Sequence, residues 1–321
     1  MKIWPVPAIE VMPFSEITES RSVILVTGPP AWNAVQNRLR LSIAWRIEPL
    51  EATRAHWDAL LADAYRLHAP LAEVVYAVGG GLVADAAKYI AVRLGLPLVC
   101  LPTALSVDAF FTWASGIRQE GCVAYIETKP PDQVVIDFDV LAAAPPSIRA
   151  AGICDVLSIA TGSWDWRFAE ERGQNPPEMA YNASVDHIAA AILQSALDCA
   201  EAAGRGDPAG LKHLLDCLVL EVQLCNQIGH ARPEEGGEHY FAYAVENALG
   251  AGLPHGDLVG PGIVLMAERQ GQPVAPLRRA LEACAIPLDT IPQAVVESTL
   301  RELPDYVRRH HLPYGIAHER M

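Results

Sequence analysis

The sequence predicts an α/β N-terminal domain with a parallel sheet, followed by an all-helical C-terminal domain. Three observations predict this fold class. The chain has 321 residues, whereas a single hydrophobic core usually stops growing near roughly 250 to 300 residues. Short apolar runs alternate with helical patterns up to the Pro145–Pro146 pair, which is typical of a parallel sheet covered by helices. Beyond that pair the strand patterns nearly stop and Ala/Leu-rich helical patterns continue.

In the first half, each element follows from its own pattern. SVILVT is typical of a buried strand, and the Gly and two prolines that follow it lead into a helix. We expect strands at 22–27 and 42–47 and in the runs EVVYAVGGG, LPLVCLP and QVVIDF, and helices at about 31–40, 51–68 and 82–94.

In the second half, helical patterns are separated by segments rich in Gly and Pro. These breaks are RGQNPPE, AGRGDPAG, HARPEEGG and GAGLPHG. We place the domain boundary at Pro146, which gives one domain at 1–146 and a second at 147–321.

Composition excludes several classes of function. The chain has 38 acidic and 24 basic residues and a net charge of −14, so we expect no nucleic-acid partner, because phosphate contacts need clustered Lys and Arg. The sequence contains no apolar run of the length, about 18 residues, that a membrane span needs, and its N-terminus does not resemble a signal peptide. Seven scattered cysteines without a C-x-x-C pair indicate reduced thiols. We therefore expect a cytoplasmic protein.

Three consecutive glycines, Gly79, Gly80 and Gly81, stand between an apolar run and a helical pattern. At such a junction the backbone N–H groups approach an anion closely and the helix dipole favours negative charge. The stretch is neither G-x-G-x-x-G nor a Walker loop, so by itself it fits a tight turn equally well. A second strand ends in the hydroxyl-rich turn LPTALSVDAFFT, and open parallel sheets bind ligands at this carboxyl edge. Together the two segments predict a phosphate-binding site.

The stretch AVGGGLVADAAKYIAVRLGLPLVCLPTALSVD resembles the sn-glycerol-1-phosphate dehydrogenase branch of the iron-containing alcohol dehydrogenase superfamily. In that branch a strand leads into GGG-x-x-x-D-x-A-K-Y and then P-T-A-x-S-x-D. The resemblance extends to RAAGICDVLSIATGSWDW, RPEEGGEHYFAYAVEN and LPHGDLVGPGIVLM, and so covers about 70–165 and 230–266. It implies a dehydroquinate synthase-like fold, in which a Rossmann-like domain at 1–146 binds the dinucleotide and the helical domain at 147–321 carries the metal and the catalytic groups.

The resemblance implies cofactor and substrate contacts residue by residue. The glycine stretch would cradle the pyrophosphate, two hydroxyls of the second turn would hydrogen-bond the cofactor, and one Thr stands where the family has a cofactor-binding Ser. The residues concerned are Gly79, Gly80, Gly81, Leu82, Val83, Thr103, Ser106 and Thr112. Asp108 matches the Asp that contacts the substrate's hydroxyl groups, so the glycines and Asp108 would line one cleft.

Four other charged residues keep two interpretations open. Asp85 and Lys88 match the family motif, but an ion pair at i,i+3 on a helix surface explains them equally well. Arg118 and Arg232 are candidates for a substrate phosphate, although an ordinary surface or structural role is favoured for each.

Asp155, His239 and His255 are candidate metal ligands, although they lie far apart in the sequence. We expect Asp155 near the start of a helix, His239 on another helix and His255 in a loop before a third. The chemistry of these residues alone favours another interpretation, in which Asp155 caps a helix and each histidine has partners at the surface or in the core. The resemblance reverses this, because in the family the Asp of A-G-x-x-D-x-L-S, the His of G-x-E-H and the His of P-H-G hold one catalytic divalent metal. We expect zinc, with iron or nickel as alternatives; three protein ligands leave coordination positions open.

The chain departs from the family pattern at three further positions. Val107 stands where the family usually has the His of S-H-D, and Tyr243 replaces a substrate-contacting His. Because i and i+4 share a helix face, we expect Tyr243 to point toward His239 and the metal and to take part in catalysis with Asp108. Gly28 stands where the family commonly has an Asp that binds the adenine ribose, so NADP is as plausible a cofactor as NAD.

We therefore expect a metal-dependent NAD(P) oxidoreductase, forming a homo-oligomer, that acts on a small polyol or polyol phosphate. Glycerol 1-phosphate and dihydroxyacetone phosphate are the leading pair, and plain glycerol is the close alternative. A sugar-phosphate cyclase such as 3-dehydroquinate synthase is a second alternative, although its first metal ligand is a Glu and its site is rich in lysine. A binding protein descended from the enzyme is the third.

Overall fold

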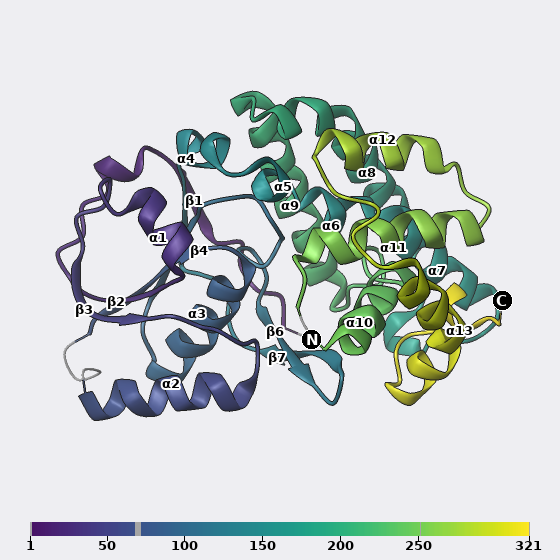
Figure 1. Ribbon diagram of the computed structural model, residues 1–321, viewed down its shortest axis with the longest axis horizontal. Helices are drawn as coiled ribbons and strands as arrows, with labels where there is room; N and C mark the ends of the chain where they lie inside the picture. Colours follow the sequence, from purple (N-terminus) through teal and green to yellow (C-terminus); the bar gives the residue numbers. More distant parts are fainter. Residues whose placement is uncertain (1, 68–71, 251, 321) are drawn as a thin grey trace. The chain divides into compact units, whose positions relative to one another are not determined.

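The computed structural model describes residues 2–67, 72–250 and 252–320, and the chain divides into two compact units. The α/β unit comprises residues 4–144, and the helical unit comprises residues 145–321 together with residues 1–3 (Figure 1). The predicted fold class is confirmed. The assignment of dinucleotide binding to the first unit and of catalysis to the second stays a prediction.

The α/β unit is built on a six-stranded sheet with the order β1-β8-β5-β4-β2-β3, in which all neighbouring strands are parallel. The strands are β1 (Ala8–Val11), β2 (Ser22–Thr27), β3 (Ser42–Ile47), β4 (Val74–Gly79), β5 (Leu98–Pro102) and β8 (Gln133–Ile136). The helices of this unit are α1 (Pro29–Val35), α2 (Arg54–Leu67), α3 (Gly81–Leu94) and α4 (Phe138–Ala143), with a 3₁₀ turn η1 (Phe14–Glu16).

The central strands are buried because both of their faces are apolar. Every residue of β4 and β5 is buried, and alternate residues such as Leu25, Tyr76 and Leu101 join Val35 of α1 in one hydrophobic cluster. Near-continuous apolar runs are typical of parallel strands covered on both faces. The carboxyl ends of these strands therefore lie side by side, at the edge where the glycine stretch begins.

Several elements differ from the sequence prediction. Helix α1 occupies 29–35 instead of 31–40, because Pro29 and Pro30 stand at its first positions, where a missing N–H is tolerated. Helix α2 begins at Arg54 and is described to Leu67, so the predicted end at 68 lies outside the described residues. Strand β1 and the antiparallel hairpin of β6 (Ala114–Gln119) and β7 (Cys122–Glu127) were not predicted.

The helical unit contains nine α-helices within its described residues, 145–250 and 252–320. They are α5 (Pro146–Arg149), α6 (Ile153–Leu157), α7 (Ile159–Glu171), α8 (Ala183–Arg205), α9 (Pro208–Ile228), α10 (Gly237–Leu249), α11 (His255–Arg269), α12 (Val274–Ala283) and α13 (Gln293–Arg309), with 3₁₀ turns η3 (Pro177–Met179) and η4 (Ile316–His318). Asn182 and Asp207 cap α8 and α9 with their side chains, as Asx residues commonly do. Across the part of the chain that the structure describes, the helices are too short or too polar to cross a bilayer.

Candidate dinucleotide and metal sites

The glycine stretch forms the junction between β4 and α3, as the sequence predicts. The backbone of Gly79 has φ 156°, a conformation that residues other than glycine rarely adopt. A Cβ at this position would lie 2.9 Å from Val83 Cγ2. A Cβ on Gly81 would lie 2.7 Å from Val107 Cγ2. Both positions therefore require glycine. No side chain caps the start of α3, so its first N–H groups can bind a ligand.

The second predicted segment lies beside the glycines at the same edge of the sheet. Strands β4 and β5 pair in parallel with Gly79 opposite Pro102, and the Thr103 backbone N–H donates to Gly79 O at 3.2 Å. Ser106 Oγ lies 3.4 Å from the point where a Cβ on Gly80 would stand. Within the α/β unit, the structure thus brings the glycine stretch together with Thr103 and Ser106. Their role in holding a cofactor stays a prediction.

Thr112 and Asp108 follow in the same segment. The Thr112 hydroxyl accepts a hydrogen bond from Lys88 Nζ at 2.7 Å and can donate to Ala114 O at 3.1 Å. Asp108 is partly buried, and its backbone oxygen accepts from Phe111 N at 2.8 Å. Asp108 belongs to the α/β unit and the three candidate metal ligands to the helical unit, so the expectation of one shared cleft stays a prediction.

Gly28 stands at the end of β2, as the N-cap residue of α1. The first turn of α1 carries no acidic residue. The local structure therefore lacks, within this turn, the carboxylate that would repel a 2′-phosphate.

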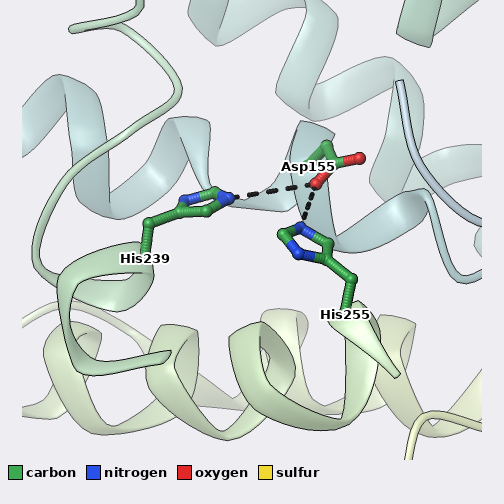
Figure 2. Close-up of side chains that lie close together, drawn as sticks. All are labelled: Asp155, His239 and His255. Carbon is green, nitrogen blue, oxygen red and sulfur yellow. Dashed lines mark hydrogen bonds and ion pairs between the residues drawn. The ribbon is translucent and has the colours of Figure 1, made fainter. Parts of the chain in front are cut away.

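Asp155, His239 and His255 converge within the helical unit (Figure 2). Asp155 Oδ1 lies 2.7 Å from His255 Nε2 and 3.9 Å from His239 Nε2. One ligand atom from each residue lies within 4.8 Å of the other two. His255 was expected in the loop before α11, and this is wrong, because His255 is the first residue of the helix. Pro254 is the last residue of the loop.

Close packing of the helices places these three side chains. Asp155 lies on α6, His239 on the first turn of α10 and His255 at the start of α11. A Cβ on Gly262 of α11 would lie 2.6 Å from Glu238 O of α10, so only glycine permits this approach of the two helices. The positions of both histidines depend on that contact.

Glu238 contacts the ring nitrogen of His239 that does not face Asp155. Its side chain is fully buried, and its Oε1 accepts from Gly236 N at 2.6 Å and from His239 Nδ1 at 2.9 Å. Burial opposes charge on the imidazole, but the hydrogen bond to Glu238 and the nearby carboxylates raise the pKa of His239 to about 9. With Nδ1 bonded to a carboxylate, Nε2 faces Asp155, which is the arrangement that metal-ligating histidines usually show. The position of Glu238 directly before His239, in the G-x-E-H pattern, is the sequence signal for this role.

The residues present fit a divalent metal. Metal–ligand bonds of about 2.0–2.2 Å place two ligand atoms of a tetrahedral site roughly 3.2–3.6 Å apart. The observed separations of 2.7 and 3.9 Å from Asp155 Oδ1 lie on either side of that value. Glu238 Oε2 is buried without a hydrogen-bond partner among the described residues, which leaves an excess of negative charge beside the histidines. A bound cation would compensate this negative charge.

Tyr243 lies next to His239 on α10, with ring centroids 6.1 Å apart. Its hydroxyl donates to Glu235 Oε1 at 2.8 Å, and burial raises the pKa of Glu235. Arg232, a candidate for phosphate binding, is buried and donates to Tyr314 O at 2.7 Å, in agreement with the favoured structural role. The catalytic role of Tyr243 stays a prediction.

Comparisons with known proteins fit this architecture. The sequence profile of the iron-containing alcohol dehydrogenase family matches residues 11–145. The chain is 30% identical over 266 residues to the glycerol-1-phosphate dehydrogenase [NAD(P)+] of Sulfurisphaera tokodaii. The aligned region covers 82% of this chain and 75% of that protein. The chain is 32% identical to the Sulfolobus acidocaldarius enzyme of the same name, over 67% of this chain but only 60% of the relative's length.

Solved structures show the same fold. Glycerol dehydrogenase from Schizosaccharomyces pombe superposes with a TM-score of 0.67 at 20% identity, over 98% of this chain and 85% of that one. The architecture that the two chains share is a parallel sheet followed by a helical unit. The chain belongs to the iron-containing alcohol dehydrogenase superfamily. Within it, the chain is a dehydrogenase that is similar to the glycerol-1-phosphate dehydrogenases.

Proposed function

We propose that this protein interconverts glycerol 1-phosphate and dihydroxyacetone phosphate with NAD(P) and one divalent metal. The observation that carries the proposal is the convergence of Asp155, His239 and His255 from three helices. The names of the relatives supply glycerol 1-phosphate, and oxidation of its secondary alcohol gives dihydroxyacetone phosphate. Oxidation moves a hydride from the carbinol carbon to the nicotinamide and releases the hydroxyl proton, and reduction reverses both transfers.

Asp155, His239 and His255 would hold the metal, with zinc as the first choice and iron or nickel as alternatives. When bound, the metal polarises the substrate oxygen as a Lewis acid. Glu238 keeps the His239 ring in one tautomer and one orientation, since its Oε1 accepts from Nδ1 at 2.9 Å. Burial of Asp155 and His239 excludes water from one side of the site.

The α/β unit supplies the proposed dinucleotide site. The open N–H groups at the start of α3 would bind the pyrophosphate, and Thr103, Ser106 and Thr112 would fix the rest of the cofactor. Asp108 would accept hydrogen bonds from the substrate hydroxyls. We expect both NADH and NADPH to be used, because Gly28 leaves no carboxylate against a 2′-phosphate.

The experiment measures dihydroxyacetone phosphate reduction and glycerol 1-phosphate oxidation by purified protein loaded in turn with zinc, iron and nickel. Glycerol and dihydroxyacetone serve as non-phosphorylated controls. We expect turnover of the phosphorylated pair, its loss on chelation and its return on adding metal. Asp155→Asn should abolish activity, whereas Asp198→Asn, at an exposed position on α8, should leave it unchanged.

Two results would separate the parts of this proposal. Turnover of glycerol without turnover of the phosphorylated pair would replace the substrate and keep the metal chemistry. Full activity of Asp155→Asn with no bound metal would overturn the assignment of the metal site. Homo-oligomer formation and a cytoplasmic location stay predictions and do not affect either result.

A further inference from the structure

Lys88 is fully buried in the α/β unit, which a helix-surface ion pair would not be. Lysine is almost never buried unless its charge is paired, because an isolated ammonium loses its hydration. The structure thus argues against the helix-surface ion pair and favours the other interpretation that the sequence left open, a role for Asp85 and Lys88 as part of the family motif. The question is what the buried ammonium holds.

The Lys88 ammonium has an acceptor for each of its three N–H groups. Asp85 Oδ1 lies 2.9 Å away and Thr112 Oγ1 2.7 Å away, and Ala114 O accepts the third hydrogen bond. Two of these acceptors lie in the segment that joins the turn after β5 to β6. A charged donor makes stronger hydrogen bonds than a neutral one, so this segment is held firmly to α3.

Asp85 holds the same segment from the previous turn of the helix. Its Oδ2 accepts from Gly116 N at 3.3 Å, and its backbone oxygen accepts from Ser115 Oγ at 3.0 Å. One turn of α3 therefore fixes the stretch from Thr112 to Gly116. The same helix begins at Gly81, seven residues before Lys88, which is roughly 10 Å at 1.5 Å per residue.

The hydrogen bonds of Thr112 determine how its hydroxyl can act. The oxygen accepts from Lys88, and its single proton has backbone acceptors at Ala114 O, 3.1 Å, and Ala109 O, 3.4 Å. A hydroxyl oxygen has two lone pairs, so one lone pair is left for a further donor. Lys88 thereby fixes the rotamer of Thr112 and the direction in which this lone pair points.

We infer that Lys88, paired with Asp85, is a positioning residue that orients Thr112 for the dinucleotide. The pair ties both halves of the cofactor site, the glycine turn and the segment after β5, to one rigid helix. Lys88 is 0% exposed and acts through Thr112 without touching the cofactor. This inference rests on the proposed function, because it takes the α/β unit as the dinucleotide-binding unit.

The test uses the full-length protein without metal and measures NADH and NADPH binding by fluorescence, below the temperature at which any variant unfolds. Lys88→Met keeps the length of the side chain and removes its charge and donors. We expect its Kd for the dinucleotide to rise roughly tenfold, the order of one hydrogen bond lost at the cofactor. Thr112→Val should give a similar rise, and Thr112→Ser a smaller one. Arg93→Met, on the exposed surface of the same helix, should leave Kd unchanged.

A double-mutant cycle distinguishes positioning from simple stabilisation. If Lys88 acts through Thr112, the Lys88→Met/Thr112→Val protein binds no more weakly than the weaker single variant. Additive losses, or a folded Lys88→Met protein with wild-type Kd, would overturn the inference. Should Lys88→Met fail to fold, Asp85→Asn/Lys88→Met removes both charges, leaves no unpaired buried ion and carries the same measurement. Failure of the wild type itself to bind either dinucleotide would instead defeat the proposed function.

Discussion

Glu238→Gln should weaken metal binding while leaving the fold of the helical unit intact. The glutamine oxygen can still accept from Gly236 N and from His239 Nδ1, which lie 2.6 and 2.9 Å from Glu238 Oε1, so the ring orientation is kept. The negative charge that strengthens the imidazole as a ligand is lost. Mutation of such an outer partner lowers metal affinity roughly 10- to 100-fold, or about 1.4–2.8 kcal/mol.

We expect Glu238→Gln to lower metal affinity by about tenfold and Glu238→Ala by about 100-fold, the two ends of this range. Alanine removes both hydrogen bonds of Oε1 and leaves two buried donors unsatisfied, whereas glutamine keeps the acceptor. The charge and the geometry are thus separated by two variants at one position. Glu201→Gln, on the exposed surface of α8, is the matched control with an 80% exposed side chain.

The assay is competition between metal-free protein and a chromophoric chelator for zinc, followed by thermal unfolding with and without zinc. A tenfold loss of affinity removes about 1.4 kcal/mol of metal-dependent stabilisation when zinc is in excess. Equal zinc affinity of the wild type and Glu238→Ala would refute the reasoning, provided that Asp155→Asn binds zinc more weakly. In that case His239 would be held in place by its packing alone.

Three further predictions concern positions outside the metal cluster. Gly81→Ala should raise the dinucleotide Kd and lower the melting temperature, because its Cβ would lie 2.7 Å from Val107 Cγ2; titration and calorimetry measure both. His318→Asn should reduce the acid sensitivity of folding. Burial, with nearby arginines, lowers the pKa of His318 to about 4, so the free energy of unfolding that it contributes is present above about 6.5 and lost as pH falls through about 4, by up to about 3 kcal/mol. Urea unfolding at the two ends of this window measures the difference. Gly204→Ala should prevent stable folding, since its Cβ would lie 1.9 Å from Ala283 O; soluble yield and circular dichroism detect the loss.

The sheet could be predicted where local pattern and burial agree. β2, β3 and β4 are each followed by a helix and β5 is a fully buried apolar run, and each of these strands was expected close to its observed position. β1 was not, because its residues are mostly exposed and its partner β8 lies more than a hundred residues further along the chain. Edge strands of this kind carry little hydrophobic pattern of their own.

The β6–β7 hairpin carried a signal that was missed. Glu120 and Gly121 have φ 54° and 77°, the left-handed conformation of the primed turns that join two antiparallel strands. The dipeptide Glu-Gly between IRQ and CVAYIE marked that turn. The hairpin bears on the proposed cofactor site because Ala114 and Gly116, which bond to α3, lie on its first strand.

The candidate metal cluster could not be derived from spacing. Asp155, His239 and His255 come together only through the packing of α6, α10 and α11, and the resemblance to a family supplied the set. The burial of Lys88 had a local signal, since Ala86, Ala87, Tyr89 and Ile90 around it are all apolar and buried. A helical stretch that is apolar on every side is buried on every side, so a lysine within this part of α3 needs partners.

Several buried carboxylates surround the start of α10, next to the candidate ligand His239. Three carboxylates, Asp165, Glu235 and Glu238, bond to groups on this helix or just before it: Asp165 Oδ2 accepts from Gly237 N at 2.8 Å, Glu235 from Tyr243 and Glu238 from His239. Burial raises the pKa of Asp165 to about 6, so this anion is unfavourable in the fold at neutral pH. Asp155, Glu235 and Glu238 place further carboxylates around the His239 imidazole. The metal-free protein therefore carries unfavourable negative charge, which a bound cation offsets. Chelation should therefore lower the stability of the helical unit as well as the activity, a coupling that a purely structural pair of histidines would not produce.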